Sequence, residues 1–274
     1  MESKGRKVAM FISILKKSIF AAACLFGTVF FPGCSSVKPV TIATYNIQIG
    51  LGMDKKYDLN RTAEAIRKIG AETVVLNEVD VKTHRSQGDD QPAILAGKLK
   101  MNYVFGEASK RKGGIYGNAV LSVHKVEKLD VIALPANEYE SRSALVVKIH
   151  APKPYYVIST HFSYEQTAKI KAVRLKCVDL LADYVKKKKY FPVLLCGDLN
   201  SYHDSEVIRR VQEQGFQIVN DLSGKMRSYP SRNPRRLLDY LCIYPADSVK
   251  AENARVIQTQ ASDHCPVAAE FLFK

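Results

Sequence analysis

The most constraining feature of this sequence is a series of short apolar runs that end in polar side chains. Residues 40–49 (VTIATYNIQI) and 73–79 (TVVLNEV) are rich in β-branched residues and short, so we expect buried strands. The polar endings along the chain are Asn46, Glu78, His161, Asp198 with Asn200, and Asp263 with His264. Acceptors at the ends of buried strands line one rim of a sheet, where a cation and a phosphate can sit. Five such endings together predict a functional rim.

Helices alternate with these strands. Between the first two strands, apolar residues recur at helical spacing from Asp58 to Ile69, behind a cap at Asp58 or Asn60. We expect further helices at 91–99, 165–187 and 205–214, and further strands at 103–106, 118–126, 143–150, 155–161, 191–196, 237–243, 255–258 and 264–272. The Arg-, Ser- and Pro-rich residues 223–236 predict a surface loop. Since no linker or internal repeat interrupts this pattern, we expect one α/β domain over residues 40–274.

The N-terminus has the pattern of a secretory signal. Five basic residues precede the apolar run 18–31, which is shorter than the roughly 20 residues that a bilayer span needs. The following Gly33-Cys34-Ser35-Ser36 resembles the bacterial lipobox, in which the cysteine is acylated. We therefore expect residues 1–33 to be removed and Cys34 to anchor the protein by a lipid in the bacterial cell envelope, at the outer membrane or periplasmic face. An ordinary secretory signal with an unmodified Cys34 is the alternative.

The charge balance favours polyanionic partners. Lys and Arg number 41 against 27 Asp and Glu, a formal net charge of +14, and only five of the basic residues lie in the first 33. A basic domain of this kind suits nucleic acid, phosphorylated small molecules or an anionic membrane surface, and charge alone does not choose among them.

The remaining cysteines do not indicate a metal site. Cys177, Cys196, Cys242 and Cys265 stand singly in apolar stretches without Cys-x-x-Cys spacing. This spacing argues against zinc, and we expect buried free thiols, although an oxidising compartment would permit a bridge.

Seven motifs occur in a fixed order along the chain. They are Thr44-Tyr45-Asn46-Ile47, Leu76-Asn77-Glu78-Val79, Gly117-Asn118-Ala119-Val120-Leu121-Ser122, Ser159-Thr160-His161-Phe162, Gly197-Asp198-Leu199-Asn200, Asp239-Tyr240 and Ser262-Asp263-His264-Cys265-Pro266. This set resembles the endonuclease/exonuclease/phosphatase superfamily over about residues 40–273, and its last G-D-L-N and S-D-H-x-P motifs are the most specific. The resemblance implies a four-layer αββα sandwich of two packed mixed β-sheets, with the active site at one rim. Asn77 stands where the family usually has Gln, and Leu237 where it often has a basic residue.

The residue types suit phosphoester hydrolysis. A phosphodiester repels nucleophiles, so its hydrolysis needs a cation on the phosphoryl oxygens, an oriented water and a protonated leaving group. Glu78, helped by Asn46 and by Asp263 directly or through water, suits a hard cation held by oxygen atoms. Mg²⁺ fits best, and Mn²⁺ or Ca²⁺ can substitute.

The resemblance implies roles for the other polar endings. Asp198 would orient or deprotonate the attacking water, and Asn200 would donate to the phosphoryl oxygen or hold Asp198. His264 would contact the transition-state oxygens, kept charged and aligned by Asp239, because a carboxylate partner raises a histidine pKa. His161 would be a second donor or the leaving-group acid. Asn118 and Arg142 are further candidates for substrate contacts.

Three functions remain open from the sequence. A nuclease would need a basic groove, which Lys110-Arg111-Lys112 and residues 227–236 could line. Short loops instead suit phospholipid head groups or sugar and inositol phosphates as substrates. A catalytically inactive phosphate-binding scaffold is the third possibility, although every expected metal and base position is filled. We expect a monomer.

Overall fold

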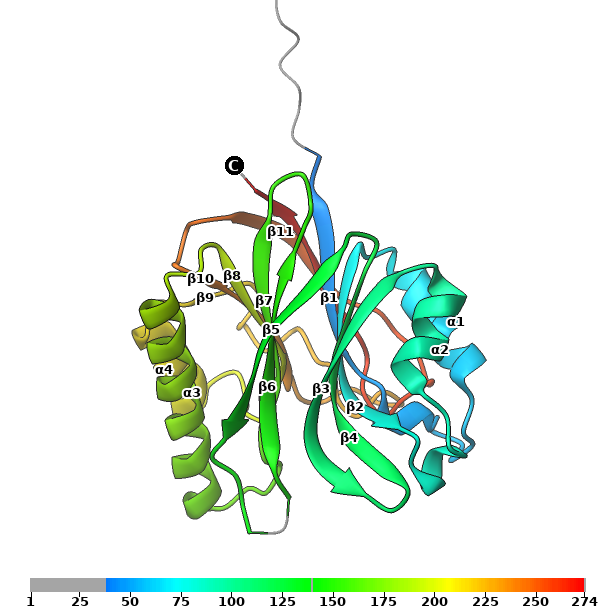
Figure 1. Ribbon diagram of the computed structural model, residues 1–274. Helices are drawn as coiled ribbons and strands as arrows, with labels where there is room; N and C mark the ends of the chain where they lie inside the picture. Colours follow the sequence, from blue (N-terminus) through cyan, green and yellow to red (C-terminus); the bar gives the residue numbers. More distant parts are fainter. Residues whose placement is uncertain (1–37, 139, 274) are drawn as a thin grey trace, which may run out of the picture. The chain divides into compact units, whose positions relative to one another are not determined.

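Two six-stranded mixed sheets pack face to face between layers of helices (Figure 1). The computed structural model describes residues 38–138 and 140–273, which belong to one compact unit from Val37 to Lys274. The first sheet contains, in spatial order, β11 (Lys250–Val256), β12 (Val267–Leu272), β1 (Val40–Asn46), β2 (Thr73–Val81), β4 (Gly114–Ser122) and β3 (Asn102–Arg111). The second contains β5 (Val126–Leu134), β6 (Arg142–Ile149), β7 (Tyr155–His161), β8 (Val193–Asp198), β10 (Asp239–Tyr244) and β9 (Gln217–Ile218).

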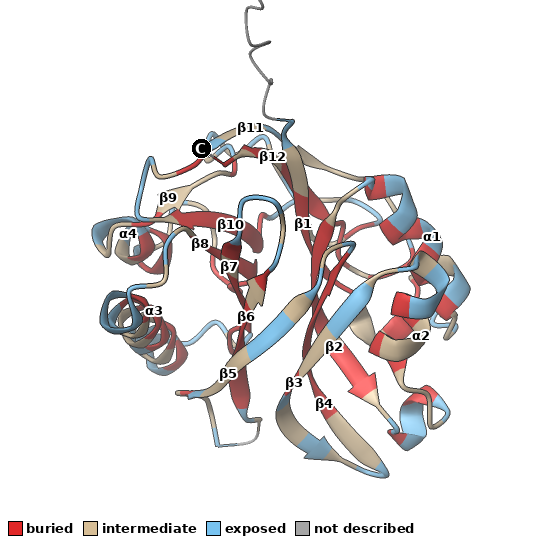
Figure 2. Cartoon of the chain, turned by 45° about the horizontal axis from the view of Figure 1, so that its top comes forward, coloured by how far each residue is buried: buried red, intermediate tan, exposed pale blue. Residues whose placement is uncertain are grey.

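Helices cover the outer face of each sheet. The first sheet is covered by α1 (Leu59–Ile69) and α2 (Gln91–Leu99), and the second by α3 (Ala168–Lys188) and α4 (Glu206–Glu213). Successive strand residues point to opposite faces, so Ile42 and Val75 pack against the second sheet while Ala43 and Leu76 pack toward α1 and α2. Buried residues therefore run through both sheets (Figure 2). The predicted four-layer sandwich is confirmed.

Side-chain caps set where the helices begin. Asp58 accepts hydrogen bonds from the backbone N–H groups of Asn60 and Arg61 and starts α1, at one of the two predicted caps. The third helix was expected from Glu165, but it begins at Ala168 because the Thr167 side chain accepts from the Ile170 N–H.

The edge strands differ from expectation. The predicted strand at 118–126 is β4, which ends at Ser122, and the chain then forms the unpredicted β5. This strand pairs only with β6 and carries charged, half-buried residues, so it lacks the continuous apolar run of a central strand. For the same reason β11 begins at Lys250 rather than at Arg255.

The four cysteines of the described region are buried and free, as expected: Cys177, Cys196, Cys242 and Cys265. The predicted signal and Cys34 lie outside the described residues. Within residues 38–138 and 140–273, no helix combines the length and the apolar character that crossing a bilayer requires.

We predict that Gly197 is needed for the close approach of β7 and β8. Its φ is +145°, and a Cβ there would lie 1.8 Å from the carbonyl oxygen of Thr160. Gly197→Ala should lower the free energy of unfolding in urea by about 3 kcal/mol or more. Gly97 lies in α2, and a Cβ added there would meet no atom within 4 Å. Gly97→Ala should therefore leave the free energy of unfolding unchanged or raise it by up to about 1 kcal/mol. Equal unfolding midpoints for the two variants would contradict the packing argument.

Candidate active site

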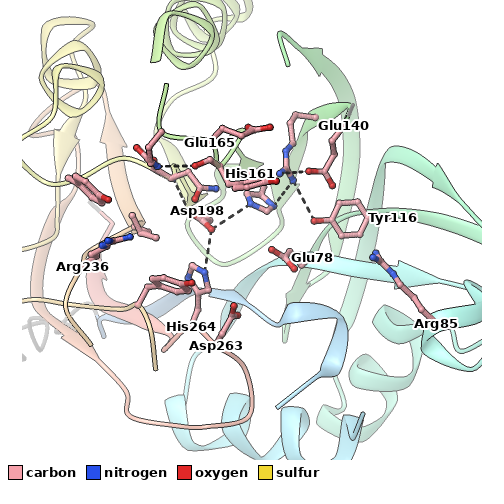
Figure 3. Close-up of a pocket in the computed structure, with 17 residues that line it drawn as sticks. Glu78, Arg85, Tyr116, Glu140, His161, Glu165, Asp198, Arg236, Asp263 and His264 are labelled. Carbon is pink, nitrogen blue, oxygen red and sulfur yellow. Dashed lines mark hydrogen bonds and ion pairs between the residues drawn. The ribbon is translucent and has the colours of Figure 1, made fainter. Parts of the chain in front are cut away.

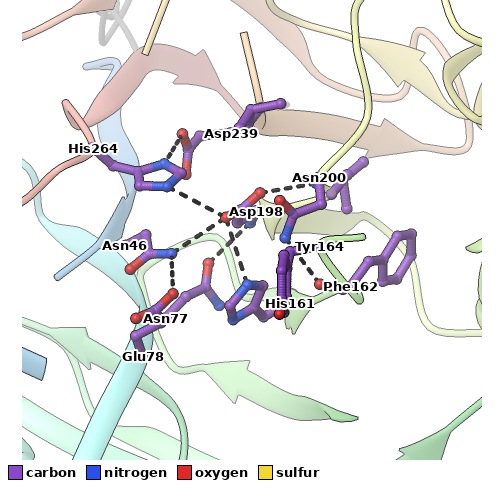
Figure 4. A network of polar contacts seen from close by, with 12 residues as sticks. Asn46, Asn77, Glu78, His161, Phe162, Tyr164, Asp198, Asn200, Asp239 and His264 are labelled. Carbon is purple, nitrogen blue, oxygen red and sulfur yellow. Dashed lines mark hydrogen bonds and ion pairs between the residues drawn. The ribbon is translucent and has the colours of Figure 1, made fainter. Parts of the chain in front are cut away.

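The carboxyl ends of two parallel strand pairs meet at one rim of the sandwich. β1 runs parallel to β2 in the first sheet, and β7 runs parallel to β8 in the second. Parallel neighbours end at the same edge, so Asn46 and Glu78 from the first sheet face His161 and Asp198 from the second (Figure 4). His264, from the segment before β12, joins them beside Asp198. The structure thus brings the predicted polar endings together.

Asn46 connects the two sheets. Its Nδ2 donates to Glu78 Oε1 at 3.0 Å and to Asp198 Oδ2 at 3.2 Å. Its Oδ1 accepts from the backbone N–H of Gln48, and its carbonyl accepts from the Ser262 hydroxyl. A buried amide with these partners holds the two carboxylates at a set separation.

A β-bulge inside β2, just after its pairing with β1 ends at Asn77, sets the direction of Glu78. The pairing of β2 with β4 shifts between Leu76 and Val79, and Glu78 has a φ of +56°. Asn77 reaches the second sheet, donating to the Thr160 carbonyl at 3.0 Å and accepting from the Asp198 N–H at 3.0 Å. Left-handed backbone at a residue other than glycine is strained and is retained where its surroundings impose it. The bulge lets Asn77 clamp the sheets while Glu78 lines the pocket.

Asn118 lies behind this clamp. Its Oδ1 accepts from Asn77 Nδ2 at 2.8 Å, and its Nδ2 donates to the Ser143 carbonyl at 3.0 Å. Asn118 is buried and does not line the pocket. The substrate contact by Asn118 stays a prediction, and in the structure this side chain supports Asn77.

His264 and Asp239 form a buried pair. His264 Nδ1 lies 2.8 Å from Asp239 Oδ2, which also accepts from the Ser228 hydroxyl at 2.6 Å. Burial by itself would lower the pKa of His264, but the negative charges of Asp239 and Asp198 outweigh it and raise this pKa well above the ordinary value. His264 therefore presents a cationic Nε2–H on the pocket side, 3.7 Å from Asp198 Oδ2.

His161 has the opposite environment. Its Nδ1 lies 3.0 Å from a guanidinium nitrogen of Arg142, and a guanidinium can only donate. Burial, Arg142 and His264 all lower the pKa of His161 well below its ordinary value. The ring is therefore neutral, with its proton on Nε2, 3.6 Å from Asp198 Oδ2. This geometry presents the Nε2–H of His161 to the site, and Arg142, whose guanidinium lies against Nδ1 of His161, also lines the pocket.

Asp198 is the central carboxylate of the rim. Its Oδ1 accepts from the Asn200 backbone N–H at 2.8 Å, while its Oδ2 faces Asn46 and both histidines. Burial raises the pKa of Asp198, and the charge of His264 opposes that shift. The Asn200 side chain donates to the Phe162 carbonyl, so Asn200 holds Asp198 through its backbone. These contacts fit a base that exchanges one proton with a water.

Oxygen ligands for a cation lie beside this network. Burial raises the pKa of Glu78, the Asn46 amide opposes the shift, and the charge of Asp263 adds to it. The Glu78 and Asp263 carboxylates, with the amide oxygen of Asn46, are the hard oxygen donors that fit Mg²⁺. Gln48 orients Asp263 by donating to its Oδ2 at 3.0 Å. Within the described residues, Asp198, Asp239 and His264 also bring possible ligand atoms within 4.8 Å, but Nδ1 of His264 is taken by Asp239.

The site opens into a pocket of about 510 Å³ (Figure 3). Its walls include residues that the sequence did not single out: Arg85, Tyr116, Tyr164, Tyr202 and Tyr229. The predicted surface loop 223–236 is largely exposed, and it also forms part of the pocket wall, where Tyr229 pairs with Arg236 and packs its ring 4.7 Å from that of His264. Arg236 and Arg85 lie on opposite sides of the pocket (Figure 3). The sequence offered one signal for Arg236: it directly precedes Leu237, which stands where the family often has a basic residue.

The pocket cations differ in how far they are neutralised. Arg85 forms an ion pair with Asp80, and Arg142 with Glu140, which Arg111 also contacts. Arg236 stacks over Tyr202 and has no carboxylate partner among the residues that the structure describes. The pocket thus offers one arginine for an anionic ligand without breaking an ion pair.

Comparison with known proteins identifies the family. The model of the endonuclease/exonuclease/phosphatase family matches residues 43–264. The chain belongs to this family. Its relatives include the uncharacterised protein YbhP of Escherichia coli K12, which is 26% identical over 245 residues, 84% of this chain and 94% of YbhP.

Solved structures of the endonuclease/exonuclease/phosphatase family share the fold. A family structure from Beutenbergia cavernae has a TM-score of 0.71 and 22% identity, and the match covers 86% of this chain and 72% of that one. The mannosyl-6-phosphatase Bt3783 of Bacteroides thetaiotaomicron has a TM-score of 0.64 and 15% identity, covering 85% and 100% of the two chains.

We predict that Asp239 acts through His264. His264→Ala should lower the turnover of bis-nitrophenyl phosphate by about 100-fold or more, because a cationic donor is lost. Asp239→Asn should have a smaller effect, and the double variant should be no slower than His264→Ala alone. Additive losses in the double variant would break the proposed pair. Circular dichroism should show native folding in all three variants.

Proposed function

We propose that this protein is a Mg²⁺-dependent hydrolase of phosphoester bonds, with phosphodiesters as the first class to test. The observation that carries the proposal is the position of Asp198 Oδ2, which faces Asn46 Nδ2 and the Nε2 atoms of both histidines within 3.7 Å. The N–H donors around this carboxylate provide phosphoryl contacts beside a base, and the Asn46 amide links it to Glu78. Family membership supports hydrolysis of phosphoesters.

Each residue of the site has a separate role in the proposed hydrolysis. Asp198 accepts a proton from a water as the water oxygen bonds to phosphorus in line with the leaving group, whose bond to phosphorus breaks and whose oxygen takes a proton from solvent. His264, held as a cation by Asp239, donates to the phosphoryl oxygens as their charge grows, and the neutral His161 offers a second N–H. Glu78 and Asp263, with Asn46, would hold Mg²⁺, which when bound neutralises phosphoryl charge.

The pocket favours a small or flexible substrate. A volume of about 510 Å³, bounded by tyrosines and by the 223–236 loop, holds one phosphoester group with a modest substituent. Of the two basic segments that a nucleic acid groove would use, Lys110 and Arg111 do not line this pocket, whereas residues 227–236 line it through Tyr229 and Arg236 and line the adjoining hollow through Arg232 and Arg235. Only one of the two segments is thus placed for a nucleic acid backbone. Among the open classes, the geometry therefore supports head-group, sugar or inositol phosphates over nucleic acid.

A substrate panel tests this function. Plasmid DNA, RNA, sphingomyelin, phosphatidylinositol phosphates, sugar phosphates and bis-nitrophenyl phosphate should be incubated with Mg²⁺, Mn²⁺, Zn²⁺ or chelator. We expect hydrolysis with Mg²⁺ or Mn²⁺, loss with chelator, and about 100-fold or more lower turnover in Asp198→Asn. Glu78→Gln should be partly rescued by high metal concentration, because it weakens the cation site without changing its shape.

A matched control is Glu64→Gln, an exposed carboxylate on α1, which should keep full activity. Full activity of Asp198→Asn on every substrate would remove the catalytic assignment, and activation by Zn²⁺ alone would remove the magnesium assignment. A wild-type chain that binds phosphate without turning over any substrate would indicate the scaffold function.

We further propose that Cys34 carries a lipid that anchors the protein in the cell envelope. The proposal rests on the basic segment, the apolar run 18–31 and Gly33 before the cysteine. Cys34→Ser should shift the protein from the membrane fraction to the soluble fraction and abolish labelling by a fatty acid. Unchanged partitioning together with absent labelling in the wild type would contradict lipidation.

A further inference from the structure

The rim opposite the candidate active site gathers exposed apolar side chains. Among the described residues, the large hydrophobic side chains that are most exposed are Tyr103, Val123, Tyr164 and Phe191, at 41–61%. Tyr164 lines the pocket. The other three lie where β3 begins, just after β4 ends and just before β8 begins. The pairing register places these strand ends at one edge, since Asn102 pairs with Ser122 and β8 starts beside β7.

Both sheets present this edge together. Thr73, at the start of β2, hydrogen-bonds to the hydroxyl of Tyr155, at the start of β7, so the edges of the two sheets adjoin. β1 also begins here, at Val40, at the upper rim in Figure 1. Because β1 is seven residues long, this rim lies about 20 Å from Asn46 and the pocket.

Exposed lysines surround the apolar side chains. The C-terminal turn of α3 and its cap supply Lys186, Lys187, Lys188 and Lys189, and Lys98, Lys100, Lys125 and Lys153 lie on neighbouring termini and loops of the same rim. None of these eight lysines forms an ion pair with a carboxylate in the part of the chain that the structure describes. Most acids of the same end have partners. Glu72 and Glu127 each contact a histidine, and ion pairs join Glu213 to Arg210, Glu252 to Lys250 and Glu270 to Arg255, whereas Asp183 and Asp247 are exposed.

We propose that this rim, here called the basal rim and defined by Tyr103, Val123, Phe191 and Lys186 to Lys189, docks on an anionic membrane surface. Lysines attract anionic head groups, and aromatic side chains partition into the interface beside them. A folded acidic partner would match the charge but not the scattered single apolar side chains. The chain preceding Val40 joins the domain at this same rim, so a lipid at Cys34 would bring the same face toward the bilayer.

Docking at the basal rim has a consequence for the substrate. When the basal rim faces the bilayer, the pocket opens on the far side of the domain, one strand length from the membrane surface. The head groups of that leaflet then cannot reach Asp198. The substrate of the proposed phosphoesterase is then water-soluble, such as a sugar or inositol phosphate released into solution. This consequence rests on the proposed function, whereas membrane docking does not.

Vesicle sedimentation tests the docking surface. The fragment starting at Val37, which contains the whole compact unit, removes any contribution from Cys34. It should sediment with vesicles of phosphatidylethanolamine and phosphatidylglycerol but not with phosphatidylcholine vesicles. Changing Lys186, Lys187, Lys188 and Lys189 to Gln should lower the bound fraction by about tenfold or more. Phe191→Ser should lower it by about fivefold even in high salt, where charge is screened.

The control changes four exposed lysines away from the basal rim to Gln: Lys55, Lys56, Lys82 and Lys176. This control variant should bind anionic vesicles within about twofold of the wild type, because vesicle binding depends on the lysines of the basal rim and not on the net charge of the whole protein. Equal losses in both quadruple variants would overturn the proposal. Binding to a DNA oligonucleotide that is lost in the basal variant while vesicle binding persists would overturn it in favour of nucleic acid.

Activity separates this proposal from the proposed function. Both quadruple variants should hydrolyse bis-nitrophenyl phosphate at the wild-type rate, because none of their lysines lines the pocket. An inactive wild type that still binds anionic vesicles would refute the function alone. Faster hydrolysis of phosphatidylinositol phosphate in the docked leaflet than of its soluble head group would refute the outward orientation.

Discussion

The burial of the Asp198 carboxylate is the constraint on which the rest of the rim depends. Burying a charged group costs hydration free energy, which hydrogen bonds and opposite charges must offset. Asp198 accepts from the Asn46 amide and the Asn200 backbone N–H and faces the cation of His264. These partners come from both sheets and from three separate stretches of sequence. The sandwich therefore has to close at this rim before the carboxylate can be accommodated, and Asn77 secures that closure.

Two histidines at similar distances from Asp198 become chemically different through their second nitrogen. Asp239 faces His264 and makes it a cation, whereas Arg142 faces His161 and keeps it neutral. Glu140 in turn forms an ion pair with Arg142, so the charge of the guanidinium is balanced at the pocket wall. Environments that separate the pKa values of similar groups also separate their roles. The site thus contains one charged and one neutral donor around one base.

The direction of the strands separates the two ends of the molecule. Parallel neighbours send the chemistry-bearing residues to the rim where β1, β2, β7 and β8 end, and leave the opposite rim to loops and helix termini. The pocket occupies the first rim, and the lysines of α3 with Phe191 occupy the second. One architecture therefore places the pocket and the proposed membrane contact on two separate faces.

The central strands and the rim residues could be predicted from the residues, because buried strands need continuous apolar runs that here end in polar side chains. The layer order followed from the family resemblance, which rests on specific motifs such as G-D-L-N and S-D-H-x-P. It did not reveal β5, whose charged edge lacks that signal, or the pairing of Arg142 with His161, which lie 19 residues apart. The support role of Asn118 and the wall formed by Tyr229 depend on side chains from other elements. These features depend on contacts between side chains of different strands and loops, and such contacts leave no periodicity in the sequence of either partner.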